Sequence, residues 1–440
     1  MLPSAVTPVL PPELLESIID EVGRSDDTQT LRAFALVCST LLHRCQSHLF
    51  KAIDLDKRVP RERYYRHFHH LLASKPRIGT YVRHLRLGDD AEDDYGRRNG
   101  VGGISWIANA KTLPQTLGLL PRLEQFSLTF NSEMMDWNDL SPATRIALEH
   151  ALSLPTLQGV SLEFISSFPP TILLSFARLK YLGLSCVEVD VVTTSPGRLN
   201  FDYPPRLEFI HLRGTPPSTI SVISRSLIAS PGRASIQKLS ITPTFEAGFC
   251  EAINELINSP PGTNLSSFEW LPSIHFSSSI GPIDLTRLAN LHFLKFVISF
   301  RRSPNQRSPF SQTLRLLNQL ASEPNQVEEI TLECYFLRIP RLSHHLAHQE
   351  ERRLLGRDSN SAAGEWGALD ALLSRPAFVR LKALKIVLSL DSIVEGDLRQ
   401  AQSVFRDALL WPKLSKKGVP VLVHPQQRTD ERFLSRTFGH

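Results

Sequence analysis

Cysteine is scarce in this sequence. Five cysteines occur in 440 residues, and no two of them stand three positions apart. A disulfide framework and a zinc ribbon both need closely spaced cysteine pairs, so the sequence excludes these two classes. The few scattered thiols favour a reducing compartment.

Long apolar runs are missing as well. The more apolar stretches, such as residues 291–300, are interrupted by polar residues and fall short of the roughly 18 needed to span a bilayer. The first 15 residues carry no Lys or Arg and contain four prolines, which is unlike a signal peptide. We therefore expect an intracellular protein, cytoplasmic and/or nuclear, that does not associate with membranes.

Neither sign of charge is in large excess. The 49 Lys and Arg residues stand against 44 Asp and Glu, a net charge of +5 that is too small over the whole chain to indicate nucleic acid. Hydrophobic residues make up 42% and charged residues 21%, the composition of a folded protein, which excludes a fully disordered chain.

The common catalytic motifs are also absent. The sequence contains no GxSxG, no GxxxxGK[ST] and no HExxH. His344 and His348 have the spacing of metal ligands on one helix face, but no acidic residue accompanies them in that motif, and we interpret them as solvated. We predict no enzyme activity, no cofactor and no metal site.

Three short apolar patterns follow one another near the N-terminus. In residues 10–22 the apolar residues recur at helical spacing behind two prolines, and Gly23 is placed to end the helix. Similar patterns occupy residues 31–38 and 39–50. Three helices of this size form a small module, which usually needs a partner or a neighbouring domain to bury its apolar surface.

The motifs in these patterns are similar to a known family. LPPELL at residues 10–15 and ALVC at residues 35–38 resemble the F-box, and RCQSHLF at residues 44–50 resembles fungal F-box variants. The resemblance covers residues 8–52 and implies a three-helix module that binds a Skp adaptor and, through it, a cullin–RING ubiquitin ligase. The residues implied in adaptor contact are Leu10, Pro11, Leu14, Ile18, Ile19, Leu31, Leu36, Val37 and Cys38. The alternative is that these helices only cap the larger domain.

One phrase recurs ten times in the rest of the chain: three apolar residues, with two positions between the first pair and one between the second. The central phrases are 22 to 29 residues apart, the period of leucine-rich repeats. Helical patterns separate them, at 140–154, 220–229, 245–257, 314–320 and 366–373. The phrases begin at Val82, Leu123, Leu157, Leu179, Leu207, Ile236, Leu265, Leu291, Val327 and Leu381.

This body resembles the degenerate leucine-rich repeats that follow many F-boxes. The resemblance implies an α/β class with an irregular solenoid, in which parallel strands lie inside and helices outside. A conventional α/β sheet of fewer strands is the alternative. We predict an F-box module at 8–52, a linker helix at 53–80, a solenoid at 81–414, and a tail at 415–440 that includes a possible last strand at 419–424.

The same phrases predict which residues line the concave face of the solenoid. Because side chains alternate along a strand, the residues between and before the last two apolar positions point away from the core. In the later repeats these positions hold aromatic and charged residues, which protein-binding surfaces favour. The candidate contacts for a target protein are Tyr181, Phe209, His211, Lys238, Glu269, Phe293 and Lys295.

The combined expectation is a substrate receptor of an SCF-type ubiquitin ligase, which docks the Skp adaptor through the F-box and an unidentified target protein through the solenoid. Two alternatives stay open. One is a protein-binding scaffold that does not recruit the adaptor, and the other is an enzyme whose site carries no recognisable motif.

Overall fold

The computed structural model describes residues 11–25, 27–37, 39–56, 61–89, 105–130, 134–174, 178–190, 207–228, 235–244, 246–271, 283–300, 310–336, 362–390 and 411–427. The chain forms two compact units, residues 1–206 and 207–440. Across the described residues, no helix has the length and apolar character needed to cross a membrane. The expectations for Leu10, Cys38, His344 and His348 lie outside the described residues.

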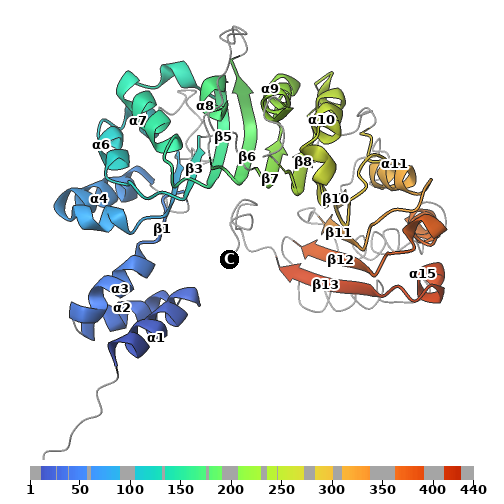
Figure 1. Cartoon of the computed structure of the whole chain (residues 1–440), viewed down its shortest axis with the longest axis horizontal. Coiled ribbons are helices and arrows are strands. Elements are labelled where there is room, and N and C mark those ends of the chain that lie inside the picture. Colours follow the sequence, from blue (N-terminus) through green and yellow to red (C-terminus); the bar gives the residue numbers. More distant parts are fainter. Residues whose placement is uncertain are drawn as a thin grey trace, which may run out of the picture. The chain divides into compact units, whose positions relative to one another are not determined.

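The first unit begins with three helices, α1 (Pro12–Arg24), α2 (Thr28–Val37) and α3 (Ser39–Leu49) (Figure 1). Pro12 stands at the first turn of α1, where its missing N–H is no loss. Asp27 begins α2 by accepting a hydrogen bond from the backbone N–H of Thr30 at 3.0 Å. The helices share a core of Ile19, Leu31, Leu41 and Cys45, each at most 8% exposed.

Gly23 lies inside α1 and does not end it, contrary to the prediction, because the helix continues through Arg24. A Cβ atom at Gly23 would lie 2.2 Å from Nδ1 of His48 on α3. The glycine is therefore required by the close approach of α1 and α3.

All ten predicted phrases are strands, and each strand begins two residues after the first residue of its phrase. The three apolar residues of every phrase are buried, with at most 5% of their surface exposed. Neighbouring phrases also pair in register, so that Leu85 lies beside Phe126 and Leu294 beside Ile330. The apolar spacing thus fixes both the strand and the side of it that faces the core.

The sheet of the first unit has the order β1-β2-β3-β5-β6, with β4 also paired to β5, and all of these pairs are parallel. Its strands are β1 (Ala52–Asp54), β2 (His84–Gly88), β3 (Gln125–Thr129), β4 (Met135–Asp136), β5 (Gly159–Phe168) and β6 (Tyr181–Val189). The helical segments between them are α4 (Arg61–Ser74), η1 (Pro76–Thr80), α5 (Trp106–Asn109), α6 (Leu113–Gly118), η3 (Trp137–Asp139), α7 (Pro142–Leu152) and α8 (Pro170–Leu174).

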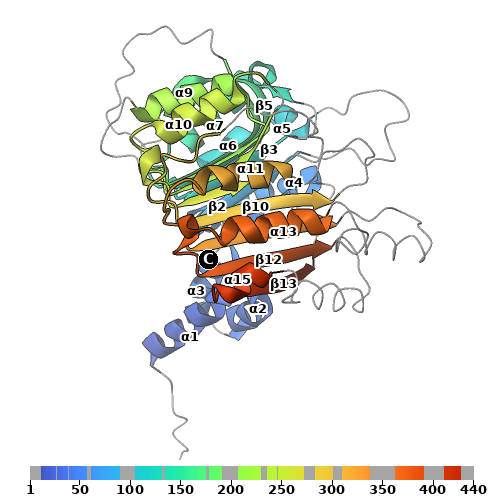
Figure 2. The ribbon, with the colours of Figure 1, turned by 90° about the vertical axis from the view of Figure 1, so that its right-hand side faces the viewer.

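The second unit repeats the same construction, with parallel strands in sequential order from β7 to β13. Figure 2 shows α11, α13 and α15 along one face of β10, β12 and β13. The strands are β7 (Phe209–Arg213), β8 (Lys238–Thr242), β9 (Ser267–Trp270), β10 (Phe293–Phe300), β11 (Glu329–Phe336), β12 (Ala383–Leu390) and β13 (Val421–Gln427). The helical segments are α9 (Pro217–Ile228), α10 (Phe249–Asn258), η4 (Gly262–Asn264), α11 (Ser311–Leu320), α13 (Ala362–Leu373), η5 (Pro376–Phe378) and α15 (Pro412–Lys416).

Parallel strands in sequential order with helices between them make an α/β fold of solenoid-like construction. The sheet extends past both predicted limits of the solenoid, residues 81 and 414. The segment 53–80 contains helix α4, but it is preceded by β1, which pairs with β2. At the other end β13 pairs with β12. Strands of two or three residues, such as β4 and β1, are too short to show a repeat in the sequence.

The last strand is held by a buried carboxylate on the preceding helix. Asp370 of α13, only 1% exposed, accepts the backbone N–H groups of Lys413 and Leu414 at 3.1 and 2.9 Å. Beside it the rings of Trp366 and Trp411 are 5.4 Å apart, centroid to centroid, in an edge-to-face contact. The N-terminus of α15, which leads into β13, is thus fixed by residues from the previous repeat.

Candidate interaction surfaces

Four large apolar side chains of the three-helix module face solvent. Leu14 and Ile18 lie one turn apart on α1 and are 52% and 44% exposed. Leu36 and Val37, at the end of α2, are 88% and 71% exposed. Pro11, just before α1, is exposed too. Exposed apolar residues on a module that has its own core are typical of an interaction site. We call Pro11, Leu14, Ile18, Leu36 and Val37 the helical surface.

Two of the residues expected to contact an adaptor do not belong to this surface. Ile19 and Leu31 are each 2% exposed and pack in the core of the module. Successive residues of a helix point about 100° apart, so Ile18 and Ile19 cannot both face outward. The prediction was wrong for Ile19 and Leu31 as contact residues, and their role is to hold the helices together.

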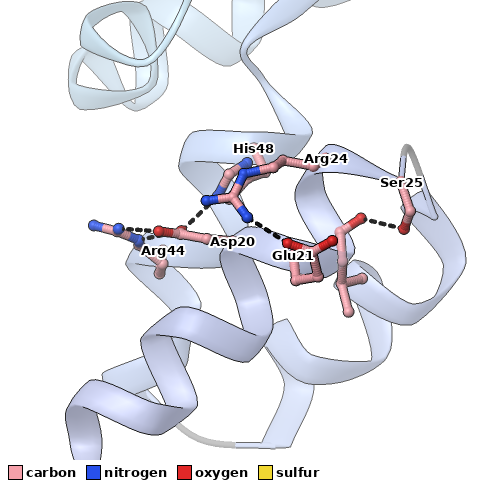
Figure 3. Close-up of polar contacts among 7 residues, drawn as sticks. Asp20, Glu21, Arg24, Ser25, Arg44 and His48 are labelled. Atoms are coloured by element: carbon pink, nitrogen blue, oxygen red, sulfur yellow. Dashed lines mark hydrogen bonds and ion pairs between the residues drawn. The ribbon is translucent and has the colours of Figure 1, made fainter.

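An ion-pair cluster joins the first and third helices. Asp20 accepts hydrogen bonds from Nε and Nη2 of Arg44 at 2.7 and 2.5 Å, and its Oδ1 lies 2.9 Å from Nε2 of His48 (Figure 3). The hydrogen bond from Arg44, and then that of His48, holds the pKa of the Asp20 carboxyl well below its ordinary value. Because Arg44 and Asp20 are partly exposed, this cluster orients α3 on α1 and contributes little stability.

The inner face of each unit is formed by the strand residues that alternate with the core residues. In the first unit Tyr181 is only 8% exposed, and its hydroxyl oxygen would lie 2.6 Å from a Cβ atom at Gly183. The ring therefore lies over the glycine next along its own face of the strand. The prediction of Tyr181 as an exposed target contact was wrong, because Gly183 has no side chain and the ring can pack against the strand there.

His211, on β7 of the second unit, is also buried, with 2% of its surface exposed. Its Nδ1 shares a hydrogen bond with the hydroxyl of Ser240, 3.0 Å away on the neighbouring strand. Burial lowers the pKa of His211 to about 4, so the imidazole is neutral at pH 7. As a surface contact His211 was therefore also a wrong prediction.

Three other predicted contacts come together on β7, β8 and β9. The ammonium group of Lys238 lies 4.7 Å from the centroid of the Phe209 ring and 2.8 Å from Oε1 of Glu269. Lys238 thus joins an aromatic face on one side to a carboxylate on the other. The side chain of Lys238 is 37% exposed and that of Glu269 is 14% exposed.

The last two predicted contacts lie on β10. Phe293 is 48% exposed, and the ammonium group of Lys295 lies 2.8 Å from Oε2 of Glu333 on β11. A third pair, Lys385 with Glu329 at 2.7 Å, was not selected from the sequence.

Within the described residues, no group of three or more His, Cys, Asp or Glu side chains has the arrangement of a metal site. A scan against protein-family models and a search of curated proteins both found no match to this chain.

Proposed function

We propose that this protein is an F-box-type substrate receptor of an SCF ubiquitin ligase. Residues 8–52 would bind a Skp adaptor, and the degenerate leucine-rich repeats that follow would bind a target protein. The protein would perform no chemistry itself. It would raise the effective concentration of the target's lysines near the loaded ubiquitin-conjugating enzyme.

The observation that carries this proposal is the exposure of the helical surface. Ile18 and Leu36 stand outside a core that Ile19 and Leu31 complete on the same two helices. A module that only capped the larger domain would bury its apolar side chains against that domain. Here they are left available. Leu36 falls within the ALVC motif, and Ile18 lies three residues after the LPPELL motif and one turn from Leu14 within it.

The repeated body supports the second half of the proposal. Its parallel strands present rows of in-register side chains, which is the arrangement that repeat proteins use to build extended binding surfaces. On the second unit these rows combine an exposed aromatic ring with charged side chains, as protein interfaces do.

The experiment is co-purification of the full chain with a Skp adaptor. The test variant carries Ile18→Asp and Leu36→Asp, which place charges on the helical surface without touching the core. We expect the wild type to retain the adaptor stoichiometrically and the variant to lose at least about tenfold in affinity, because each change buries a charge in an apolar contact.

The matched control is Ile146→Asp on α7, where an isoleucine is 66% exposed outside the module. The control should bind the adaptor as the wild type does, and all three proteins should have the same circular dichroism spectrum and thermal midpoint. If the wild type does not bind the adaptor, the scaffold alternative replaces the proposal. If the double variant binds unchanged, the helical surface does not contact the adaptor and the observation that carries the proposal is lost.

A further inference from the structure

The three lysine–glutamate pairs on the inner face of the second unit share one asymmetry. In each pair the lysine is the more exposed partner: 37% against 14% for Lys238 and Glu269, and 29% against 4% for Lys295 and Glu333. For Lys385 and Glu329 the values are 35% and 28%. The carboxylates lie deeper and the ammonium groups lie nearer to solvent. Although the pairs are neutral, the surface that a ligand meets is therefore cationic.

The most exposed apolar side chain of this face lies among these lysines. Phe293 is 48% exposed, and its register partners are Ser267 on β9 and Glu329 on β11. Lys295 stands two positions from Phe293 on β10 itself. Lys238 on β8 and Lys385 on β12 stand two strands away on either side, which at about 4.8 Å per strand is about 10 Å.

We propose that this surface, made of Lys238, Phe293, Lys295 and Lys385, binds an extended acidic segment of the target protein. An apolar side chain of the segment packs on Phe293, and Asp or Glu residues on both sides of it meet the lysines. An extended chain advances about 3.3 Å per residue, so the acidic residues stand two or three positions from the apolar one. The biological meaning of this inference rests on the proposed function, because the segment would belong to the ubiquitylation target.

Charge complementarity selects an acidic partner over a basic one. A carboxylate that arrives at Lys238 or Lys385 meets an ammonium group that is already held in place, so little side-chain entropy is lost on binding. A basic segment would have to reach Glu269 or Glu333, which are 14% and 4% exposed, or compete with Lys385 for Glu329. In each case it would break an existing ion pair. The buried, neutral His211 adds no charge to this choice.

The probe is a phage-displayed library of short random peptides, selected on the full chain at low ionic strength. We expect enriched peptides to carry an apolar residue with Asp or Glu two or three positions away on each side. A fluorescent copy of an enriched peptide should bind the wild type with an affinity that falls as salt is added. Enrichment of neutral or basic peptides would overturn the proposal, as would no enrichment at all.

Two variants place the binding on this surface. Phe293→Ser removes the ring without breaking an ion pair, and it should lower the affinity for the fluorescent peptide at least about tenfold. The double variant Lys238→Gln and Lys385→Gln should lower this affinity as much and remove most of its salt dependence. If either variant binds the peptide like the wild type, the surface has been wrongly assigned. Phe293→Ser keeps the test valid should the double variant fold poorly.

The matched control is Lys382→Gln, because Lys382 forms the same kind of pair with Glu328 at 2.8 Å but stands before β12 and outside this surface. Its peptide affinity should equal that of the wild type. Adaptor co-purification of the same proteins separates the two proposals. Acidic peptides bound without the adaptor would overturn the receptor function and leave this inference standing, whereas adaptor bound without acidic peptides would do the reverse.

Discussion

The inner faces of the two units are built on one backbone pattern with different side chains. In the first unit the central row of the face passes through Ser127, Ser161 and Gly183, all buried. In the second unit the same row passes through Glu269, Lys295 and Lys385, which engage in ion pairs with neighbouring strands. At β2 the row of the first unit also holds Arg86, which pairs with the buried Asp56. From β3 to β6 the first face is small and close-packed, whereas the second face is charged and partly exposed.

This difference teaches that the repeat phrase and the function of the repeat are separate properties. The apolar positions are equally buried in both units, so the core places the same demand on each. The residues between them are free to vary, and in the second unit they place exposed aromatic and charged side chains on this face. Four experiments test whether the two faces differ energetically as they do chemically.

The largest effect is expected from the pH dependence of His211. Its folded-state pKa of about 4 lies below the ordinary value of about 6.5, so the unfolded chain binds more protons between these limits. The free energy of unfolding should therefore fall as the pH drops, by about 2 kcal/mol between pH 7 and pH 5. Urea denaturation at both pH values should show this loss in the wild type. In His211→Asn the loss of unfolding free energy between pH 7 and pH 5 should be smaller by the contribution of His211. Equal slopes in the two proteins would contradict the assignment.

A loss of about the same size is expected when a deep carboxylate of the second face loses its partner. Lys295→Met leaves Glu333 with 4% of its side chain exposed and without that ion pair. Because Lys295 itself is partly exposed, we expect about 2 kcal/mol, below the range for fully buried pairs. Urea denaturation at pH 7 measures it, and an unchanged midpoint would show that the pair is not needed for folding.

The first face should respond to size and not to charge. Gly183→Val places carbon atoms where the Tyr181 hydroxyl now lies, 2.6 Å from the new Cβ atom. We expect a loss of about 1–2 kcal/mol. Because Tyr181→Ala itself removes a buried ring, the comparison is a double-mutant cycle. Gly183→Val should cost less in the Tyr181→Ala background than in the wild type, and thermal denaturation of the four proteins measures this. An equal cost in both backgrounds would show that the tyrosine is not the obstacle.

The smallest effect is expected at the pair outside both faces. Lys382 is 71% exposed, and its loss in Lys382→Gln should change the free energy of unfolding by less than about 0.5 kcal/mol. A change as large as that of Lys295→Met would mean that burial does not rank these pairs, and the contrast between the faces would lose its energetic basis.

The sequence was sufficient to predict the body of the fold because its signal is repeated. A single apolar residue would be ambiguous. Leu294 and Phe296, however, have apolar equivalents at the same two positions of the nine other phrases, and all of these residues are buried. The helices at 140–154 and 366–373 followed from the same periodicity and are present as α7 and α13. The short strands β1 and β4 contain too few residues to hold the apolar phrase, so the sequence did not predict them.

The exposure of individual face residues could not be predicted in the same way. His211 and Phe293 occupy inner-face positions of similar phrases, yet one is 2% and the other 48% exposed. The difference comes from their surroundings, since His211 is hydrogen-bonded to Ser240 across the strand gap. Likewise Ile18 and Ile19 are the same residue type, and only the packing of α1 on α2 and α3 separates the exposed side chain from the buried one.

The ion pairs of the second unit also depend on the order of its repeats. Each lysine reaches a glutamate two positions away from its own register partner, on the next strand for Lys238 and Lys295 and on the preceding strand for Lys385. If the repeat containing β9 were lost, β8 and β10 would still pair through their apolar residues, but Lys238 would then stand diagonal to Lys295. The apolar pairing is therefore the same for any neighbouring repeat, whereas each ion pair requires one particular neighbour.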